Sequence, residues 1–244
     1  MPLDQAEAFV LRTANIGDQD KIAVFLTRDK GLIRGVAKGA RKFGNRFGSS
    51  LEPMSRVTLF YYDKERRDLI TVSGCDLIES FFEFQSDLRT SLTLSYFGEL
   101  IEEFVPVRAR EDIVFRLLGS VLDALKKKGD LALLTGYFEA WLLRVNGLLP
   151  DVRRCQKCRQ PLETGGWLSP KKDGVCCAAC ATSKKEETPP GLATFLEWVR
   201  KNSPVRWAEF PLTAGELKAI RRVLRSVIVY HLEREPRSLR WLKD

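Results

Sequence analysis

The spacing of apolar residues changes once along this chain of 244 residues, close to Ser80. Before that point, short runs alternate between apolar and polar residues, which is typical of β-strands. After it, apolar residues recur every three or four positions, which is the spacing of one face of an α-helix. The change predicts an α+β protein, with a β-domain over residues 1–80 and a helical domain after it.

Short strands with no long helix between them fill the first domain. The predicted strands are Ala6–Thr13, Lys21–Arg28, Leu32–Val36, Arg56–Tyr62 and Leu69–Ser73. In the third strand, the adjacent Leu32 and Ile33 are the only break in the alternation, and a charged turn at Asp63–Asp68 joins the last two strands. Five strands in about 75 residues favour a closed barrel of the OB-fold type. An SH3-like barrel has the same number of strands and is the alternative.

The helical domain is predicted over residues 81–150 and 188–244, interrupted by an insertion at 151–187 that lacks apolar periodicity. The expected helices run from Leu88 to before Pro106, from Ile113 to Lys128, from an Asp130 cap to Asn146, from Pro190 through Val199, and from Thr213 to about Arg234. The last helix opens with Thr213 and Glu216 in the form of a capping box. We expect the helices on either side of the insertion to pack together.

Residues 31–48 combine five cations with five glycines and two phenylalanines, and contain no acid. The cations are Arg34, Lys38, Arg41, Lys42 and Arg46. Such a loop suits a phosphate backbone, because the charges neutralise phosphates and the glycines allow main-chain N–H groups to approach closely. Phe43 and Phe47 could stack on unpaired bases. The alternative is a solvated basic loop with both phenylalanines in the core.

Overall composition supports a polyanionic partner, because the formal net charge is +8 and the pI is near 9.2. No run approaches the ~18 apolar residues of a membrane helix. The N-terminal MPLDQAEAF has no basic segment followed by an apolar one, so no secretory signal is predicted. We therefore expect a cytoplasmic protein without a membrane partner, whose six cysteines are thiols or metal ligands.

Two C-x-x-C pairs lie in the insertion, separated by 18 residues. They are formed by Cys155 with Cys158 and by Cys177 with Cys180. Each pair can present two thiolates to one tetrahedral ion, so the spacing predicts a zinc ribbon with one structural Zn²⁺ per chain. Cys176 could replace Cys177 in a looser pair, but Cys177 matches the spacing of the first. Disulfides and a thioredoxin-like redox motif are the disfavoured alternatives.

No arrangement of residues in the sequence indicates catalysis. The only histidine, His231, falls in line with the apolar face of the last helix, and neither a Walker A motif nor G-x-S-x-G is present. We therefore predict a binding protein and not an enzyme; a metal-dependent enzyme is the least favoured class.

A basic stripe marks the last helix at positions i, i+3, i+4 and i+7. It consists of Lys218, Arg221, Arg222 and Arg225. A solvated helix face is the ordinary explanation of such a stripe, and a second nucleic-acid contact is the alternative.

Together these parts resemble the RecO family of bacterial recombination mediators, over the whole chain. The segment from Thr27 to Lys42 is similar to that family's "KGL…VAKGARK" stretch, and Ile16-Gly-Asp-Gln-Asp20 to its G-E-x-D turn, with Asp18 in place of the glutamate. Arg237–Leu242 resembles its C-terminal ending. Lys38, Arg41 and Lys42 lie on the matching motif, so the resemblance implies DNA contact for them; Arg34 and Arg46 flank it and rest on charge.

The resemblance implies binding of single- and double-stranded DNA and annealing of complementary strands. It also implies loading of a recombinase onto DNA coated by single-strand-binding protein, in cooperation with RecR, and association with the nucleoid during repair. No local motif marks a pocket for the single-strand-binding protein. An RNA-binding module built on the same barrel and ribbon, and a scaffold for protein contacts, are the competing interpretations.

Overall fold

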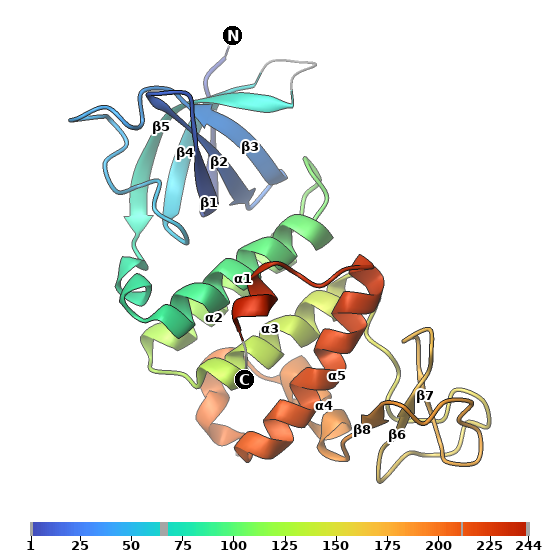
Figure 1. The fold of residues 1–244 in the computed structure, drawn as a ribbon. Helices are drawn as coiled ribbons and strands as arrows, with labels where there is room; N and C mark the ends of the chain where they lie inside the picture. Colours follow the sequence, from blue (N-terminus) through green and yellow to red (C-terminus); the bar gives the residue numbers. More distant parts are fainter. Residues whose placement is uncertain (1, 64–67, 211, 243–244) are drawn as a thin grey trace. The chain divides into compact units, whose positions relative to one another are not determined.

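Five strands close into a barrel at the N-terminal end of the computed structural model, which describes residues 2–63, 68–210 and 212–242 (Figure 1). They are β1 (Asp4–Ile16), β2 (Asp20–Thr27), β3 (Gly31–Ala37), β4 (Arg56–Tyr62) and β5 (Leu69–Glu79). The order around the barrel is β1-β2-β3-β5-β4, with β3 and β5 parallel and β4 returning to β1. This arrangement confirms the OB-type barrel. The charged turn expected at Asp63–Asp68 falls largely outside the described residues.

Both faces of the barrel wall are buried around β3, which explains the break in its alternation. Ile33 belongs to the apolar core inside the barrel, and the neighbouring Leu32 is equally buried. The outer surface of the wall is covered nearby, where the ring of Phe9 lies 4.9 Å from that of Phe115. Gly31 (φ +60°) has no room for a side chain, because a Cβ would lie 2.0 Å from the carbonyl oxygen of Ala109.

The chain divides into two compact units. The first unit comprises the described residues of 1–116 and 236–243, and the second those of 117–235. Helix α1 (Leu88–Phe104) therefore groups with the barrel, as does the short 3₁₀ turn η3 (Ser238–Trp241). Glu99 on α1 accepts hydrogen bonds from the backbone N–H groups of Arg237 and Ser238, at 2.8 and 2.9 Å, which fixes that returning segment.

The second unit is built from α3 (Leu131–Val145), α4 (Gly191–Lys201) and α5 (Ala214–Leu232), with α2 (Asp112–Lys126) crossing the border between the units. As expected, helices on either side of the insertion pack together: Trp141 on α3 donates its indole N–H to the carbonyl of Val199 on α4. The capping box of α5 is present, with Thr213 and Glu216 bonded in both directions. None of the described helices is long and apolar enough to cross a bilayer.

Residues of the insertion form a small antiparallel sheet of β6 (Gly166–Leu168), β7 (Val175–Cys176) and β8 (Glu187–Thr188), in the order β7-β6-β8. Glu186 holds this sheet to α5, because it forms an ion pair with Lys172 and accepts a hydrogen bond from Ser226 at 2.6 Å. Burial alone would raise the pKa of Glu186, but these two partners bring it below its ordinary value. Two short 3₁₀ turns, η1 (Phe82–Ser86) and η2 (Pro204–Glu209), complete the fold.

Candidate nucleic-acid interface and metal centre

The basic loop, residues 38–55 between β3 and β4, is a chain of hydrogen-bonded turns. Gly39 donates its N–H to the Asp20 carboxylate at 2.7 Å. Arg41 donates its backbone N–H to the carbonyl of Gln19 at 3.0 Å and its guanidinium to that of Gly17 at 2.9 Å. The turn between β1 and β2 therefore holds the basic loop, a role that sequence reasoning missed. In the sequence, the signal for this contact was that the β1–β2 turn and the basic loop both resemble segments of the same family.

All five predicted cations in this region are exposed, and four of them lie on the basic loop itself: Lys38, Arg41, Lys42 and Arg46. Within the described ranges, none of these four forms an ion pair with an acidic side chain. Their charge is therefore available to a polyanion.

Arg34 differs from the other four, because it lies within β3 and reaches toward α1. One guanidinium nitrogen is 3.7 Å from the carboxylate of Glu102, which also pairs with Arg12 at 2.5 Å. The Glu102 side chain is only 10% exposed, so the pairing places Arg34 in a salt-bridge cluster on the outside of the barrel. Its charge is partly neutralised by this contact.

The two phenylalanines of the basic loop have opposite environments. Phe47 is buried in the barrel core, whereas Phe43 is fully exposed. Each sequence-based interpretation therefore describes only one of them: Phe47 is an anchor in the core, and Phe43 is an aromatic ring facing solvent.

The four residues of the predicted basic stripe on α5 do not form one continuous exposed surface. Lys218 and Arg222 are exposed, but Arg221 is only 5% exposed and Arg225 is largely covered. Both inward-facing arginines approach the carboxylate of Glu139, with Nε–oxygen distances of 4.0 Å for Arg221 and 3.5 Å for Arg225.

Glu139 is completely buried on α3 and accounts for the inward direction of these arginines. A buried carboxylate requires a cationic or hydrogen-bonding neighbour, because desolvation of an isolated charge is costly. Sequence reasoning overlooked this residue. The signal for Glu139 in the sequence was a single acidic residue in the helix LALLTGYFEAWLLRV, which has no other charged residue before Arg144.

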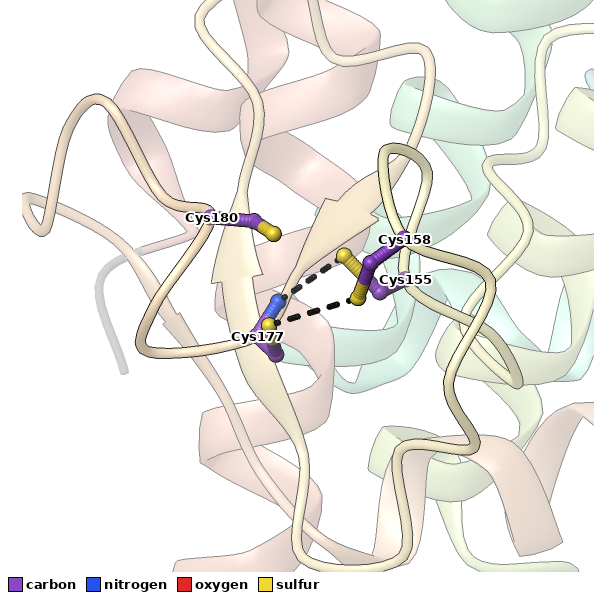
Figure 2. A group of neighbouring side chains, drawn as sticks. All are labelled: Cys155, Cys158, Cys177 and Cys180. Atoms are coloured by element: carbon purple, nitrogen blue, oxygen red, sulfur yellow. Dashed lines mark hydrogen bonds between the residues drawn. The ribbon is translucent and has the colours of Figure 1, made fainter.

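The four predicted metal ligands come together in the insertion. The sulfur atoms of Cys155, Cys158, Cys177 and Cys180 all lie within 4.8 Å of one another. Figure 2 shows Cys155 and Cys158 on one loop facing Cys177 and Cys180 on another, with 3.8 Å between the sulfurs of Cys158 and Cys177. Cys176 is buried in β7 and is not a member of the group. This donor set can hold a metal ion.

Backbone N–H groups already favour the charged state of one of these thiols. The backbone N–H groups of Cys158 and Cys177 lower the pKa of Cys155 to about 5. Hydrogen bonding with the neighbouring thiols, first that of Cys158, raises the pKa of Cys180 to about 12. Thiols this close oppose one another's ionisation, and a bound cation would remove that opposition.

Cys75 lies apart from this group, in the barrel core, where burial raises its pKa to about 12.

Two family models match this chain, one in its N-terminal part and one in the remainder. Residues 1–81 match the family model "Recombination protein O N terminal", and residues 85–240 match "Recombination protein O C terminal". A protein of Koribacter versatilis named "DNA repair protein RecO" is 33% identical over 233 residues, which are 96% of this chain and 95% of that protein. One of Dehalococcoides mccartyi with the same name is 30% identical over 98% of this chain and 94% of its own length. The chain therefore belongs to the RecO family.

Proposed function

We propose that this protein is a recombination mediator in DNA repair that binds single- and double-stranded DNA and anneals complementary strands. With RecR, it would help to load the recombinase onto DNA coated by single-strand-binding protein. The family and the names of its relatives support a role in DNA repair. The observation that carries DNA binding is the set of four exposed cations on an ordered loop, without an acidic partner in the described part of the chain.

In this proposal the basic loop holds the phosphates of one strand. Lys38, Arg41, Lys42 and Arg46 release counterions when they neutralise phosphates, which makes affinity dependent on salt. Annealing requires no covalent chemistry. A cationic surface screens the repulsion between two strands and raises their local concentration, and base pairing then drives the step.

A second strand requires a second surface, for which Lys218 and Arg222 are the exposed candidates on α5. We assign DNA contact chiefly to residues 1–80, the helical body to 81–150 and 188–244, and metal binding to 151–187. Arg34 contributes less to DNA contact because of its pairing with Glu102.

The metal in this proposal is one structural Zn²⁺ held by Cys155, Cys158, Cys177 and Cys180. Tetrahedral Zn–S bonds of about 2.3 Å place the sulfurs about 3.8 Å apart, and the sulfurs of Cys158 and Cys177 have that separation. Four thiolates complete the coordination, so the ion would stabilise the insertion. Elemental analysis should find about one zinc per chain and its loss in a Cys155→Ser/Cys177→Ser variant; metal-free wild-type protein would contradict the assignment.

Annealing of complementary oligonucleotides coated with single-strand-binding protein tests the function. We expect salt-sensitive annealing by the wild-type protein and a strong loss in Lys38→Glu/Lys42→Glu. Arg110→Glu/Lys127→Glu is the matched control, because it reverses two exposed charges outside the basic loop. If the wild-type protein binds DNA but never anneals coated strands, the mediator proposal fails. A strong preference for RNA would favour an RNA-binding module instead.

A further inference from the structure

Phe43 contributes nothing to the packing of the barrel. It is fully exposed, whereas the other aromatic residue of the same loop, Phe47, is 3% exposed and fills part of the barrel core. An exposed phenylalanine gives the folded barrel no buried apolar area. Its position therefore points to a ligand.

The turn that carries Phe43 is well defined. Asn45 donates its side-chain amide to the carbonyl of Lys42 at 3.1 Å and accepts the N–H groups of Phe47 and Gly48 at 3.0 and 3.2 Å. The buried ring of Phe47 fixes the C-terminal side of the turn, and Arg46 lies over that ring at 4.8 Å. Phe43 is thus presented on a preorganised support, which reduces the entropy lost on binding.

The charges around Phe43 define the ligand that suits it. Arg41, Lys42 and Arg46 are exposed neighbours in the sequence, and none pairs with an acid among the described residues. A ligand with phosphates and accessible flat rings satisfies both features. A single strand offers its base faces, whereas in a duplex each face is already stacked on the next base pair.

We propose that Phe43 stacks on an unpaired base and makes the basic loop selective for single-stranded over double-stranded DNA. This inference rests on the proposed DNA binding and adds a division of labour: the cations bind phosphates of either form, and the ring binds only the single strand. As two strands pair, the bases leave the ring, so the duplex is held by its phosphates alone.

The test compares the affinities of Phe43→Ala for oligo(dT) and for a duplex of equal length, at one salt concentration. Stacking by one aromatic side chain corresponds to a loss of about 5- to 150-fold on substitution by alanine. We expect that loss for the single strand, duplex affinity within about twofold of the wild type, and recovery of the single-strand affinity in Phe43→Trp. Phe82→Ala is the matched control, because Phe82 is 60% exposed on η1, beside Glu83.

A strand containing 2-aminopurine reports the stack directly, since stacking on an aromatic ring quenches its fluorescence. Quenching at saturation that disappears in Phe43→Ala supports the proposal. Equal losses for single strand and duplex, or unchanged affinity for both, would overturn it. If the wild type binds DNA and Lys38→Glu/Lys42→Glu does not, while Phe43→Ala matches the wild type, only this inference fails. If the wild type binds no DNA, the proposed function fails with it.

Discussion

The basic loop and helix α5 both carry runs of cationic residues, yet the structure treats their charges differently. In the basic loop, Lys38, Arg41, Lys42 and Arg46 face solvent. On α5, Arg221 and Arg225 turn inward to Glu139, and only Lys218 and Arg222 of the predicted stripe remain on the surface. The difference shows that a run of like charges becomes a surface only where no distant acid draws it into the core.

The largest expected effect comes from removing that acid. Glu139→Gln takes away the carboxylate that both inward-facing arginines approach, so their positive charge loses this buried anion. We expect the free energy of unfolding to fall by about 3–5 kcal/mol. Urea unfolding followed by circular dichroism measures it. Asp123→Asn, at an exposed position on α2, should stay within about 0.5 kcal/mol of the wild type; equal effects of the two substitutions would refute the distinction.

The basic loop should show the opposite behaviour, with affected binding and unaffected stability. Lys38→Ala/Lys42→Ala removes two exposed charges, so the slope of log affinity against log salt should become shallower by about 1.4 for a single strand. Fluorescence anisotropy with a labelled single strand, titrated at several salt concentrations, gives the slope. The free energy of unfolding should change by less than about 1 kcal/mol. An unchanged slope would mean that these lysines do not contact phosphates.

The exposed half of the α5 stripe provides a smaller effect that is confined to the two-strand reaction. Lys218→Glu/Arg222→Glu should slow annealing by roughly tenfold through weaker electrostatic attraction of the second strand. Affinity for one strand should be retained, because the basic loop is intact. Stopped-flow annealing and anisotropy on the same preparations separate the two quantities. Equal losses in both would argue against two separate DNA surfaces.

Arg34 should show the smallest effect, although it lies close to the basic loop in the sequence. Arg34→Ala removes one partner of Glu102, which keeps its 2.5 Å contact with Arg12. The Arg34 side chain is about half exposed and its contact with Glu102 is long, so the pair should contribute about 0–1 kcal/mol, as pairs at the surface do. We expect a similarly small change in stability and the same salt slope as the wild type. A decrease of the slope by about one would place Arg34 among the phosphate contacts.

Features that depend on local spacing could be predicted from the sequence. The strands before Ser80, the capping box at Thr213 and the gathering of Cys155, Cys158, Cys177 and Cys180 all follow from residues close together in the chain or from paired motifs. The inward turn of Arg225 could not be predicted in this way, because its partner Glu139 is 86 positions away. A helical pattern shows which residues share a face but not what that face meets.

Order within the basic loop was also beyond sequence reasoning. Its glycines predicted close approach of main-chain N–H groups to phosphates, but not that Gly39 would donate its N–H to Asp20 or that the side chain of Asn45 would organise the turn that follows. Likewise, Phe43 and Phe47 have the same chemistry and similar neighbours, so the sequence offered no means to separate the buried ring from the exposed one.

The hydrogen bonds that Glu99 accepts from Arg237 and Ser238 bear on the order in which the protein folds during synthesis. They join α1 to a segment that the ribosome adds more than a hundred residues later. Domains usually fold as they emerge, N-terminal part first. Here the strands of the barrel can pair early, but the first unit gains its 236–242 segment only after the entire second unit has been synthesised. A nascent chain stalled before residue 236 would therefore present α1 without that cover to the chaperones of the cell.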